Sequence, residues 1–461
     1  MKKINEIGDL REWALENVWT PLRPWDVLTA PEGFTTFTQG NGCRVRDIEG
    51  NEYLDFASGM MVNFVGYGRK EIADAAYDQM LRMQFTPTHD LCVPKIKLAK
   101  KLADITPGSL SKVFFGLSGQ FSIETAIKIA RKYQQISGFY RKLKIIGSYA
   151  YHGFTYGAAS AGWHGNLNHK DFEPLVPGFV HVASPKCPIC DFGLKYPSCN
   201  VVCAKYIEKI IQKEIPETVA AFLDVPVSTH GYVPPPEYWP IVRSICDKYG
   251  MLLIHDEVMS GFGRTGKMFA CEHWNIVPDI MVVAKGLAGG YMPISAAIVT
   301  KEVARKFEGG ANEVLLHSVS FEGHPPSCAA ALTTLEIIER EKLVENAEAM
   351  GKYLFKELQS LRKYRIVGQI LGGLGLLAAV ELVRDSESGE PFSPEENKRV
   401  QSLLKGKLMK AGLFGQFGNP ILISPPLIVS EDEIDQIMRG LDKVIGEIEK
   451  EFDWIKKGHK G

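Results

Sequence analysis

The sequence has no uninterrupted apolar run long enough to span a bilayer, and its start, Met1–Asp9, lacks the apolar core of a secretory signal. It also lacks an excess of charge, because 53 lysines and arginines nearly balance 54 aspartates and glutamates. No bulk attraction to nucleic acid or to an anionic membrane is therefore expected. The nine cysteines are an odd number in a chain of 461 residues, which is typical of reduced thiols rather than of a disulfide framework. We expect a cytoplasmic enzyme that acts on small molecules, with neither nucleic acid nor membrane as a partner.

What is present is an ordinary globular composition and a regular alternation of short apolar runs with helical stretches. Hydrophobic residues make up 45% of the chain and charged residues 23%, which suffices for a large core. One predicted helix, Tyr238–Tyr249, ends before Gly250, a residue typical of helix C-caps. The alternation predicts an α/β fold with a mainly parallel sheet. The apolar runs are Val113–Phe115, Lys144–Ile146, Val219–Leu223, Met251–Ile254, Ile280–Ala284 and Ala296–Val299.

A change of pattern near residue 327 predicts a second, smaller α+β domain at the C-terminal end. A long helix is expected through Cys328–Leu361, followed by a few strands and by an amphipathic helix from Asp432 onward. Near the other end, Arg44–Asp47 and Tyr53–Phe56 flank a turn and predict a hairpin. We therefore divide the chain into an N-terminal arm and hairpin that contribute to the small domain (1–69), a large domain (70–327) and the C-terminal small domain (328–461).

Two of the apolar runs each end at an ionisable residue. Asp256 follows Met251–Ile254, and Lys285 follows Ile280–Ala284. Because ligands of open parallel sheets bind beyond the carboxyl ends of the strands, both side chains are candidates for one crevice. Pyridoxal 5′-phosphate (PLP) requires such a pair, a lysine for the Schiff base and a carboxylate that keeps the pyridine nitrogen protonated. Taken alone, a lysine at a strand end is more often a solvent-exposed side chain than a cofactor ligand. Whether Lys285 binds PLP must therefore be judged from the other segments of the chain.

Other segments add candidate contacts for the same cofactor. Gly119 and Gln120 begin a predicted helix after a strand, where free backbone N–H groups favour an anion, although an ordinary turn is the commoner reading. Tyr151 precedes His152 and Gly153 after another strand, and an aromatic ring there either stacks on a flat heterocycle or belongs to the core. The branched side chain of Val258 is suited to packing on the opposite face of such a ring.

Together these segments resemble the class III (subgroup II, fold type I) PLP-dependent aminotransferases, a family that also contains related amino-acid racemases. The resemblance extends over nearly the whole chain. It is most specific in the run from Asp256 to Gly266, which reads Asp-Glu-Val-Met-Ser-Gly-Phe-Gly-Arg-Thr-Gly, and in Ala284-Lys285-Gly286. It implies a fold type I transferase with a seven-stranded sheet, and a homodimer or a tetramer whose subunits share their active sites.

The resemblance also implies a role for each residue. Lys285 would form the Schiff base with PLP and move a proton between the substrate α-carbon and C4′ of the cofactor, and Asp256 would pair with the pyridine N–H. An aminotransferase working by a ping-pong mechanism is the first reading, and a racemase or epimerase of the same fold is the alternative. The expected cofactor contacts are Gly119, Gln120, Tyr151, His152, Asp256, Val258 and Lys285, with Ser320 reaching the phosphate of the neighbouring subunit.

The sequence departs from the family pattern at four places, one of which is Met60-Met61, where a tryptophan is common in the omega-aminotransferases. Gln120 stands where a serine or threonine is usual, Val225 where a glutamate is usual, and Gln416 where an arginine often binds the substrate carboxylate. A neutral amide at position 416 forfeits most of a charge-assisted contact. With Met61 and Gln416 as substrate contacts, we expect an amine or ω-amino-acid donor and a 2-oxo acid acceptor such as pyruvate. If Arg264 or Arg44 binds the substrate carboxylate in place of Gln416, we expect the enzyme to accept ordinary α-amino acids as donors.

Four cysteines lie close together in the sequence, at Cys187, Cys190, Cys199 and Cys203. Four thiolates in one short segment are able to form a structural zinc site. The spacing differs from that of a standard zinc finger, and similar cysteine-containing inserts occur in relatives that do not need them for catalysis. We therefore assign no metal ligand, and a loop of ordinary thiols is the preferred reading.

Overall fold

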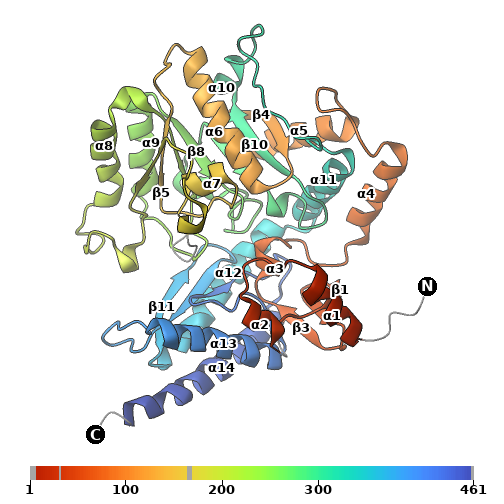
Figure 1. Cartoon of the computed structure of the whole chain (residues 1–461), viewed down its shortest axis with the longest axis vertical. Coiled ribbons are helices and arrows are strands. Elements are labelled where there is room, and N and C mark those ends of the chain that lie inside the picture. The colour runs from red at the N-terminus through yellow and green to blue at the C-terminus, as the bar shows by residue number, and fades with distance from the viewer. Residues whose placement is uncertain (1–6, 31–32, 164–168, 458–461) are drawn as a thin grey trace.

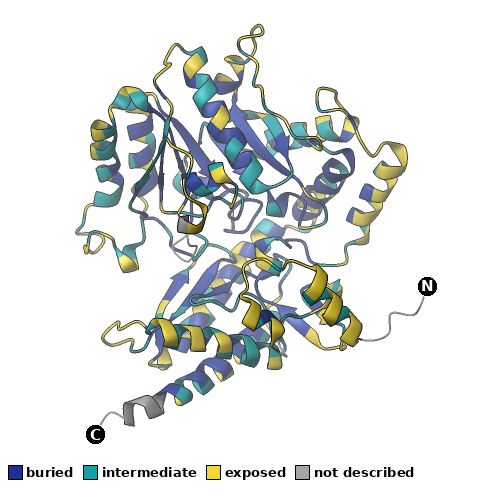
Figure 2. Cartoon of the chain, in the orientation of Figure 1, coloured by how far each residue is buried: buried dark blue, intermediate teal, exposed yellow. Residues whose placement is uncertain are grey.

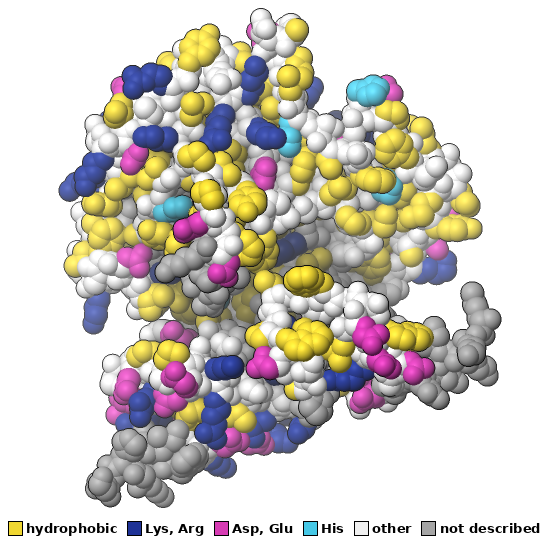
Figure 3. Space-filling view, in the orientation of Figure 1, with side chains coloured by type: hydrophobic (Ala, Val, Ile, Leu, Met, Phe, Trp, Pro, Cys, Tyr) yellow, Lys and Arg dark blue, Asp and Glu magenta, His cyan; other side chains and the backbone are white. Residues whose placement is uncertain are grey.

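The computed structural model describes residues 7–30, 33–163 and 169–457. Figure 1 shows two lobes, a large one in the upper half, built on a central sheet, and a small one in the lower half, where the N-terminal and C-terminal segments lie together. Figure 3 shows that this face of the molecule is hollowed along the line where the two lobes meet. No helix among the described residues combines the length and the apolar character needed to cross a bilayer.

The large lobe is organised by a seven-stranded sheet. Strands β6, β5, β7, β8 and β9 pair in parallel, whereas β10 runs antiparallel to both of its neighbours, β4 and β9. The predicted α/β fold with a mainly parallel sheet is confirmed, and β10 makes the sheet mixed. In spatial order the strands are β4 (Leu110–Gly116), β10 (Ser295–Thr300), β9 (Ile280–Val283), β8 (Leu252–Asp256), β7 (Val219–Asp224), β5 (Lys144–Ser148) and β6 (Phe179–Val182).

Helices cover both faces of this sheet, which is why its central strands are buried along their whole length (Figure 2). On one face, α6, α7 and α10 pack on the strands, and on the other face α8 and α9 do so. Gly250 ends α9 in a left-handed conformation, as the sequence predicts. The helices of this lobe are α4 (Lys70–Arg82), α5 (Val93–Ile105), α6 (Gly119–Ile136), α7 (Tyr156–Ala161), α8 (Val202–Glu214), α9 (Tyr238–Tyr249) and α10 (Lys301–Arg305).

The small lobe contains two further sheets. In the first, the predicted hairpin of β2 and β3 is extended by β13, which pairs in parallel with β3 although the two lie far apart in the sequence. The other sheet has the order β11-β12-β14 and is antiparallel. The strands of the two sheets are β1 (Phe37–Asn41), β2 (Arg44–Asp47), β3 (Glu52–Asp55), β13 (Leu413–Phe414), β11 (Val367–Gly372), β12 (Ala378–Leu382) and β14 (Ile421–Ile423).

The single long helix expected through Cys328–Leu361 is wrong. The segment forms two helices, α11 and α12, because Lys342 adopts a left-handed conformation (φ 52°) between them. The domain boundaries given above stay a prediction. The helices outside the large lobe's sheet layers are α1 (Ile7–Asn17), α2 (Trp25–Thr29), α3 (Ser58–Met61), α11 (Pro325–Arg340), α12 (Leu343–Leu358), α13 (Pro394–Lys410) and α14 (Glu431–Lys457). Short 3-10 turns occur at His169–Phe172, Cys187–Ile189, Pro216–Thr218, Ala270–Trp274, Lys285–Leu287 and Gln359–Lys363.

Candidate active site

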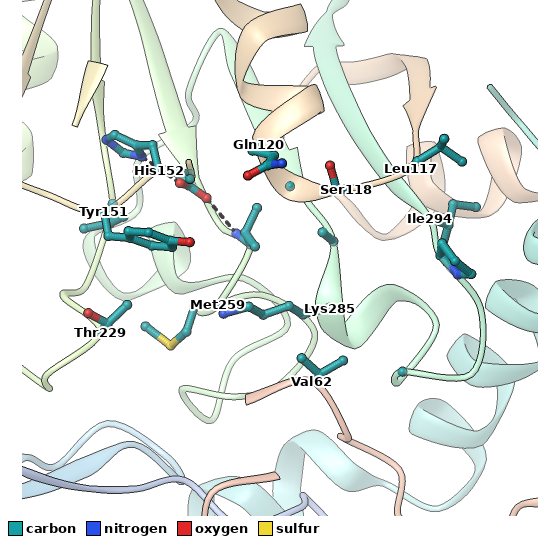
Figure 4. A pocket seen from close by; sticks show the side chains of 18 of the residues that line it. Val62, Leu117, Ser118, Gln120, Tyr151, His152, Thr229, Met259, Lys285 and Ile294 are labelled. Atoms are coloured by element: carbon teal, nitrogen blue, oxygen red, sulfur yellow. Dashed lines mark hydrogen bonds and ion pairs between the residues drawn. The ribbon is translucent and has the colours of Figure 1, made fainter. Parts of the chain in front are cut away.

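A cavity of about 440 Å³ opens at the carboxyl ends of β8 and β9 (Figure 4). The parallel strands bring their ends to one edge of the sheet, as expected for an α/β fold. Seven of the predicted site residues lie on the wall of this single cavity. They are Gly119, Gln120, Tyr151, His152, Asp256, Val258 and Lys285.

Asp256, the last residue of β8, is held rigidly at the cavity wall. Its Oδ1 accepts a hydrogen bond from the backbone N–H of Val258 at 3.0 Å, and its Oδ2 lies 2.7 Å from Nδ1 of His152. Because an ionised carboxylate only accepts hydrogen bonds, Nδ1 of His152 must carry the proton. The carboxylate is thus oriented on two sides, and the same oxygens still have lone pairs that face the cavity.

Lys285 follows β9 in a left-handed backbone conformation (φ 38°), which is unusual for a residue with a side chain and is found most often at functional sites. The bend directs the side chain along the cavity, and Figure 4 shows its amine end near Met259. Its Nζ forms no hydrogen bond with a described residue. Burial lowers the pKa of Lys285 to about 8, although the charge of Asp256 opposes the shift. A desolvated amine with a lowered pKa is suited to nucleophilic attack on a carbonyl.

Tyr151 and Val258 both lie on the wall of the cavity. Burial raises the pKa of the Tyr151 phenol, and the charge of Asp256 adds to the shift. Val258 packs against Gly119, where an added Cβ atom would lie 3.0 Å from both of its Cγ atoms. An aromatic ring and a branched aliphatic group are both suited to packing against a flat heterocycle.

The N-terminus of α6 borders the same cavity through Ser118, Gly119 and Gln120. The Ser118 hydroxyl caps the helix by accepting the N–H of Phe121 at 3.4 Å, and the N–H groups of Gly119 and Gln120 precede the first turn. Such a terminus favours an anion, because its N–H groups point outward and the helix dipole is positive there. The side chain of Gln120 is engaged elsewhere, since its Oε1 accepts the N–H of Phe154 at 3.0 Å.

Three predicted residues do not lie on this wall. Met61 is buried one layer behind it, in an apolar cluster with Val227 and Met259, and its neighbour Val62 lines the cavity instead. Gln416 is half-buried and forms a bridge with Leu422. Ser320 is exposed on the loop before α11. The roles of all three residues therefore stay predictions.

Several wall residues were not predicted from the sequence. Many of them come from two loops, one after β7 and one before β10, and the members of these loops on the wall are uncharged. The Gly289-Gly290 pair after Lys285, with positive φ at both glycines, was a sequence signal for the second loop. The additional wall residues include Val227, Thr229, Gly290, Met292, Pro293 and Ile294.

The two arginines considered as carboxylate ligands are both engaged elsewhere. Arg264 is fully buried and donates to the carbonyls of Leu376 (3.0 Å) and Pro425 (2.6 Å), with its guanidinium 4.4 Å from the centre of the Phe64 ring. Arg44 lies in the small lobe and donates to Gln436 at 2.7 Å. Neither arginine lines the cavity.

Comparisons with known proteins agree with this geometry. The family model described as Aminotransferase class-III matches residues 29–445. The chain belongs to the class III aminotransferases. It is 37% identical to the taurine–pyruvate aminotransferase of Bilophila wadsworthia, over 93% of this chain and 96% of that protein. It is 34% identical to the putrescine–pyruvate aminotransferase of Pseudomonas aeruginosa, over 88% and 89%.

Solved structures give the same result. An (S)-enantioselective omega-transaminase from Thermomicrobium roseum superimposes with a TM-score of 0.91 at 36% identity, covering 96% of this chain and 99% of that one. The predicted family, the fold type I architecture, the aminotransferase class and the dependence on PLP are confirmed.

The described residues fit PLP. The unpaired amine of Lys285, the carboxylate of Asp256 facing the same cavity and the free N–H groups of α6 match the aldehyde, the pyridine nitrogen and the phosphate of the cofactor. Tyr151 and Val258, on the wall of the same cavity, are suited to packing against its ring.

The four clustered cysteines are free thiols of intermediate exposure. Within the described part of the chain, they are not among the groups whose ligand atoms all lie within 4.8 Å of one another; His255, Glu257 and Cys271 form the one such group. Glu257 already accepts the N–H groups of Ala270 (3.1 Å) and Cys271 (2.8 Å), so this buried carboxylate holds the following loop. No metal ligand is assigned.

Proposed function

We propose that this enzyme transfers the amino group of a primary amine or ω-amino acid to a small 2-oxo acid, pyruvate foremost, by a ping-pong mechanism. Bound PLP supplies an electron sink for charge that develops at the α-carbon. Asp256 sustains the sink by holding the pyridine nitrogen protonated, and His152 fixes the orientation of Asp256. Lys285 would hold the cofactor and would move a proton to and from the substrate α-carbon.

The proposed donor is supported by the residues that form the cavity wall. Lys285 is its only lysine, and no arginine is present among the described residues that line it. Elsewhere the wall is largely apolar, with Val62, Met259 and Ile294 among its members. Without a guanidinium, an α-carboxylate beside the reacting amine loses the bidentate contact that it prefers. The wall therefore favours a donor whose reacting carbon bears no carboxylate.

The acceptor is proposed from the relatives. The proteins from Bilophila wadsworthia and Pseudomonas aeruginosa are both named for pyruvate as the partner of their amine. A 2-oxo acid carries a carboxylate beside its reacting carbon, so the choice of acceptor rests on these relatives and not on the cavity wall.

A panel of donors with pyruvate as the acceptor tests the proposal. We expect terminal amines and ω-amino acids to outrun glutamate and aspartate in alanine formation. If glutamate or aspartate is the fastest donor, the argument from the missing arginine is wrong. The racemase alternative is separated by incubating a single-enantiomer amino acid without any 2-oxo acid, because only a racemase would invert it at turnover rates.

We also propose a homodimer that shares its active sites. Large apolar side chains are exposed on α4, on the segment after it, on the start of α5 and on the loop before α11 (Figure 3). A patch of this kind is typical of a protein–protein interface. Ser320 lies on that same loop, between Leu316, which is 90% exposed, and Phe321, which is 50% exposed. A second subunit that covers the patch would bring Ser320 toward the cofactor phosphate of its neighbour.

A further inference from the structure

A second cavity of about 300 Å³ adjoins the cofactor cavity. The two share Tyr151, Val225 and Thr229 as common walls. The far side of the second cavity is formed by the small lobe, through Glu381 of β12 and Asn419 before β14. A ligand that extends past the shared wall from the cofactor therefore enters a space between the two lobes.

Two carboxyl groups line this second cavity. Asp224 ends β7 and is fully buried; its Oδ1 accepts from the Ser148 hydroxyl and from the N–H of Val225, both at 2.8 Å. Its Oδ2 is buried and has no hydrogen-bond partner. Glu381 lies between the buried residues Val380 and Leu382, so the alternation along β12 directs its side chain away from the core of its own sheet.

Glu381 has no fixed counter-ion. It forms no ion pair with any described residue; burial raises the pKa of its carboxyl group, and a hydrogen bond from the backbone N–H of Gln369 partly offsets this shift. The nearby charge of Glu381 also contributes to the raised pKa of Tyr232, after the larger effect of burial. A half-buried carboxylate without a cation is costly, which makes Glu381 a ready partner for a cationic ligand.

Aromatic rings complete the lining. Tyr149, Tyr151, Trp163 and Tyr232 all contribute to the wall. Ring faces attract cations, and the ammonium of Lys186 lies 5.9 Å from the centre of the Tyr232 ring. Lys186 is the one lysine of this wall in the described chain, and it stands against two carboxyl groups. The charged groups on this wall therefore favour the binding of a cationic ligand over an anionic one.

We propose that the second cavity binds the distal ammonium group of a long diamine donor while the other amino group reacts beside Lys285. The inference rests on the function proposed above and names a subclass of its donors. The uncharged methylene chain would pass Thr229 and Val225, and the free ammonium would lie between Glu381 and the aromatic rings, with Asp224 behind them. The reacting end of such a donor carries no carboxylate, in agreement with the cofactor cavity.

The test compares cadaverine with pentylamine, which has the same chain and lacks the second amine, each with pyruvate as the acceptor. Wild-type enzyme should prefer cadaverine in kcat/KM. Glu381→Gln should lower that value for cadaverine roughly tenfold to a hundredfold, the range expected for a lost charge-assisted contact, and leave pentylamine unchanged. The pentylamine rate also reports whether the variant is folded and loaded with cofactor.

Lys186→Gln is the matched control for Glu381→Gln, because it removes a positive charge from the same wall instead of a negative one. Removing this cation from the same wall should improve kcat/KM for cadaverine and leave pentylamine unchanged. The inference is overturned if wild-type enzyme treats both amines alike, or if Glu381→Gln weakens both equally. It is also overturned if Lys186→Gln selectively weakens δ-aminovalerate while Glu381→Gln spares cadaverine, because the cavity would then bind an anionic end. Absence of turnover with every amine and pyruvate, with glutamate active, would instead refute the proposed function.

Discussion

Replacing Asp256 by asparagine preserves the shape of the side chain and removes its charge. In the enzyme the two carboxylate oxygens serve two N–H donors, those of Val258 and His152. An amide has one acceptor oxygen and an NH₂ group that only donates. In Asp256→Asn, therefore, one of the two donors faces the NH₂ group, and the pyridine nitrogen of the cofactor loses its anionic partner.

The expected size of the effect follows from these contacts. A hydrogen bond to a charged group contributes about 1.5–3 kcal/mol, so the lost contact alone should weaken cofactor binding roughly tenfold to a hundredfold. The reaction with amine should slow by more than that. Asp256 acts on the electronics of the ring in the transition state in addition to holding the ring in place.

Rapid mixing of the PLP-loaded variant with a saturating amine, followed by absorbance of the bound cofactor, measures the first half-reaction directly. Asp224→Asn is the control, because Asp224 is a buried carboxyl at the end of the neighbouring strand β7 and does not line the cofactor cavity. With pentylamine, which lacks a second ammonium group, its half-reaction should be close to that of the wild type. If Asp256→Asn reacts at wild-type speed, or if both variants slow equally, Asp256 does not act directly on the cofactor.

Two further predictions concern the covalent attachment point and the assembly. Because burial lowers the pKa of Lys285 to about 8, its amine is protonated below that pH and neutral above it. Covalent uptake of PLP by the apoenzyme should therefore accelerate as the pH rises through about 8, and Lys285→Ala should retain PLP only noncovalently; a flat pH profile would contradict the assignment. Light scattering should give the mass of at least two chains of 51.2 kDa, and Leu316→Asp should shift it toward one; a monomeric wild type would refute the shared-site proposal.

The sequence by itself determined the elements that depend on local pattern. Asp256 and Lys285 were identified because each ends a short apolar strand, and the carboxyl ends of parallel strands meet at one edge of a sheet. The hairpin of β2 and β3 and the end of α9 at Gly250 were likewise predicted, because turn and cap chemistry acts over a few residues. The seven residues that the resemblance implies as cofactor contacts line one cavity, and their roles stay predictions.

Features that depend on distant contacts were decided only by the tertiary structure. The antiparallel direction of β10 and the break at Lys342 have no strong signal in the apolar periodicity. Arg264 was a candidate ligand in the sequence, whereas the fold buries it against two backbone carbonyls. The second cavity joins Asp224 to Glu381, residues from different lobes, and their proximity arises only when β12 packs opposite the end of β7. The spacing of apolar residues along the chain indicates which face of a helix or strand is apolar. Which other helix or strand packs on that face is set by contacts between elements far apart in the sequence.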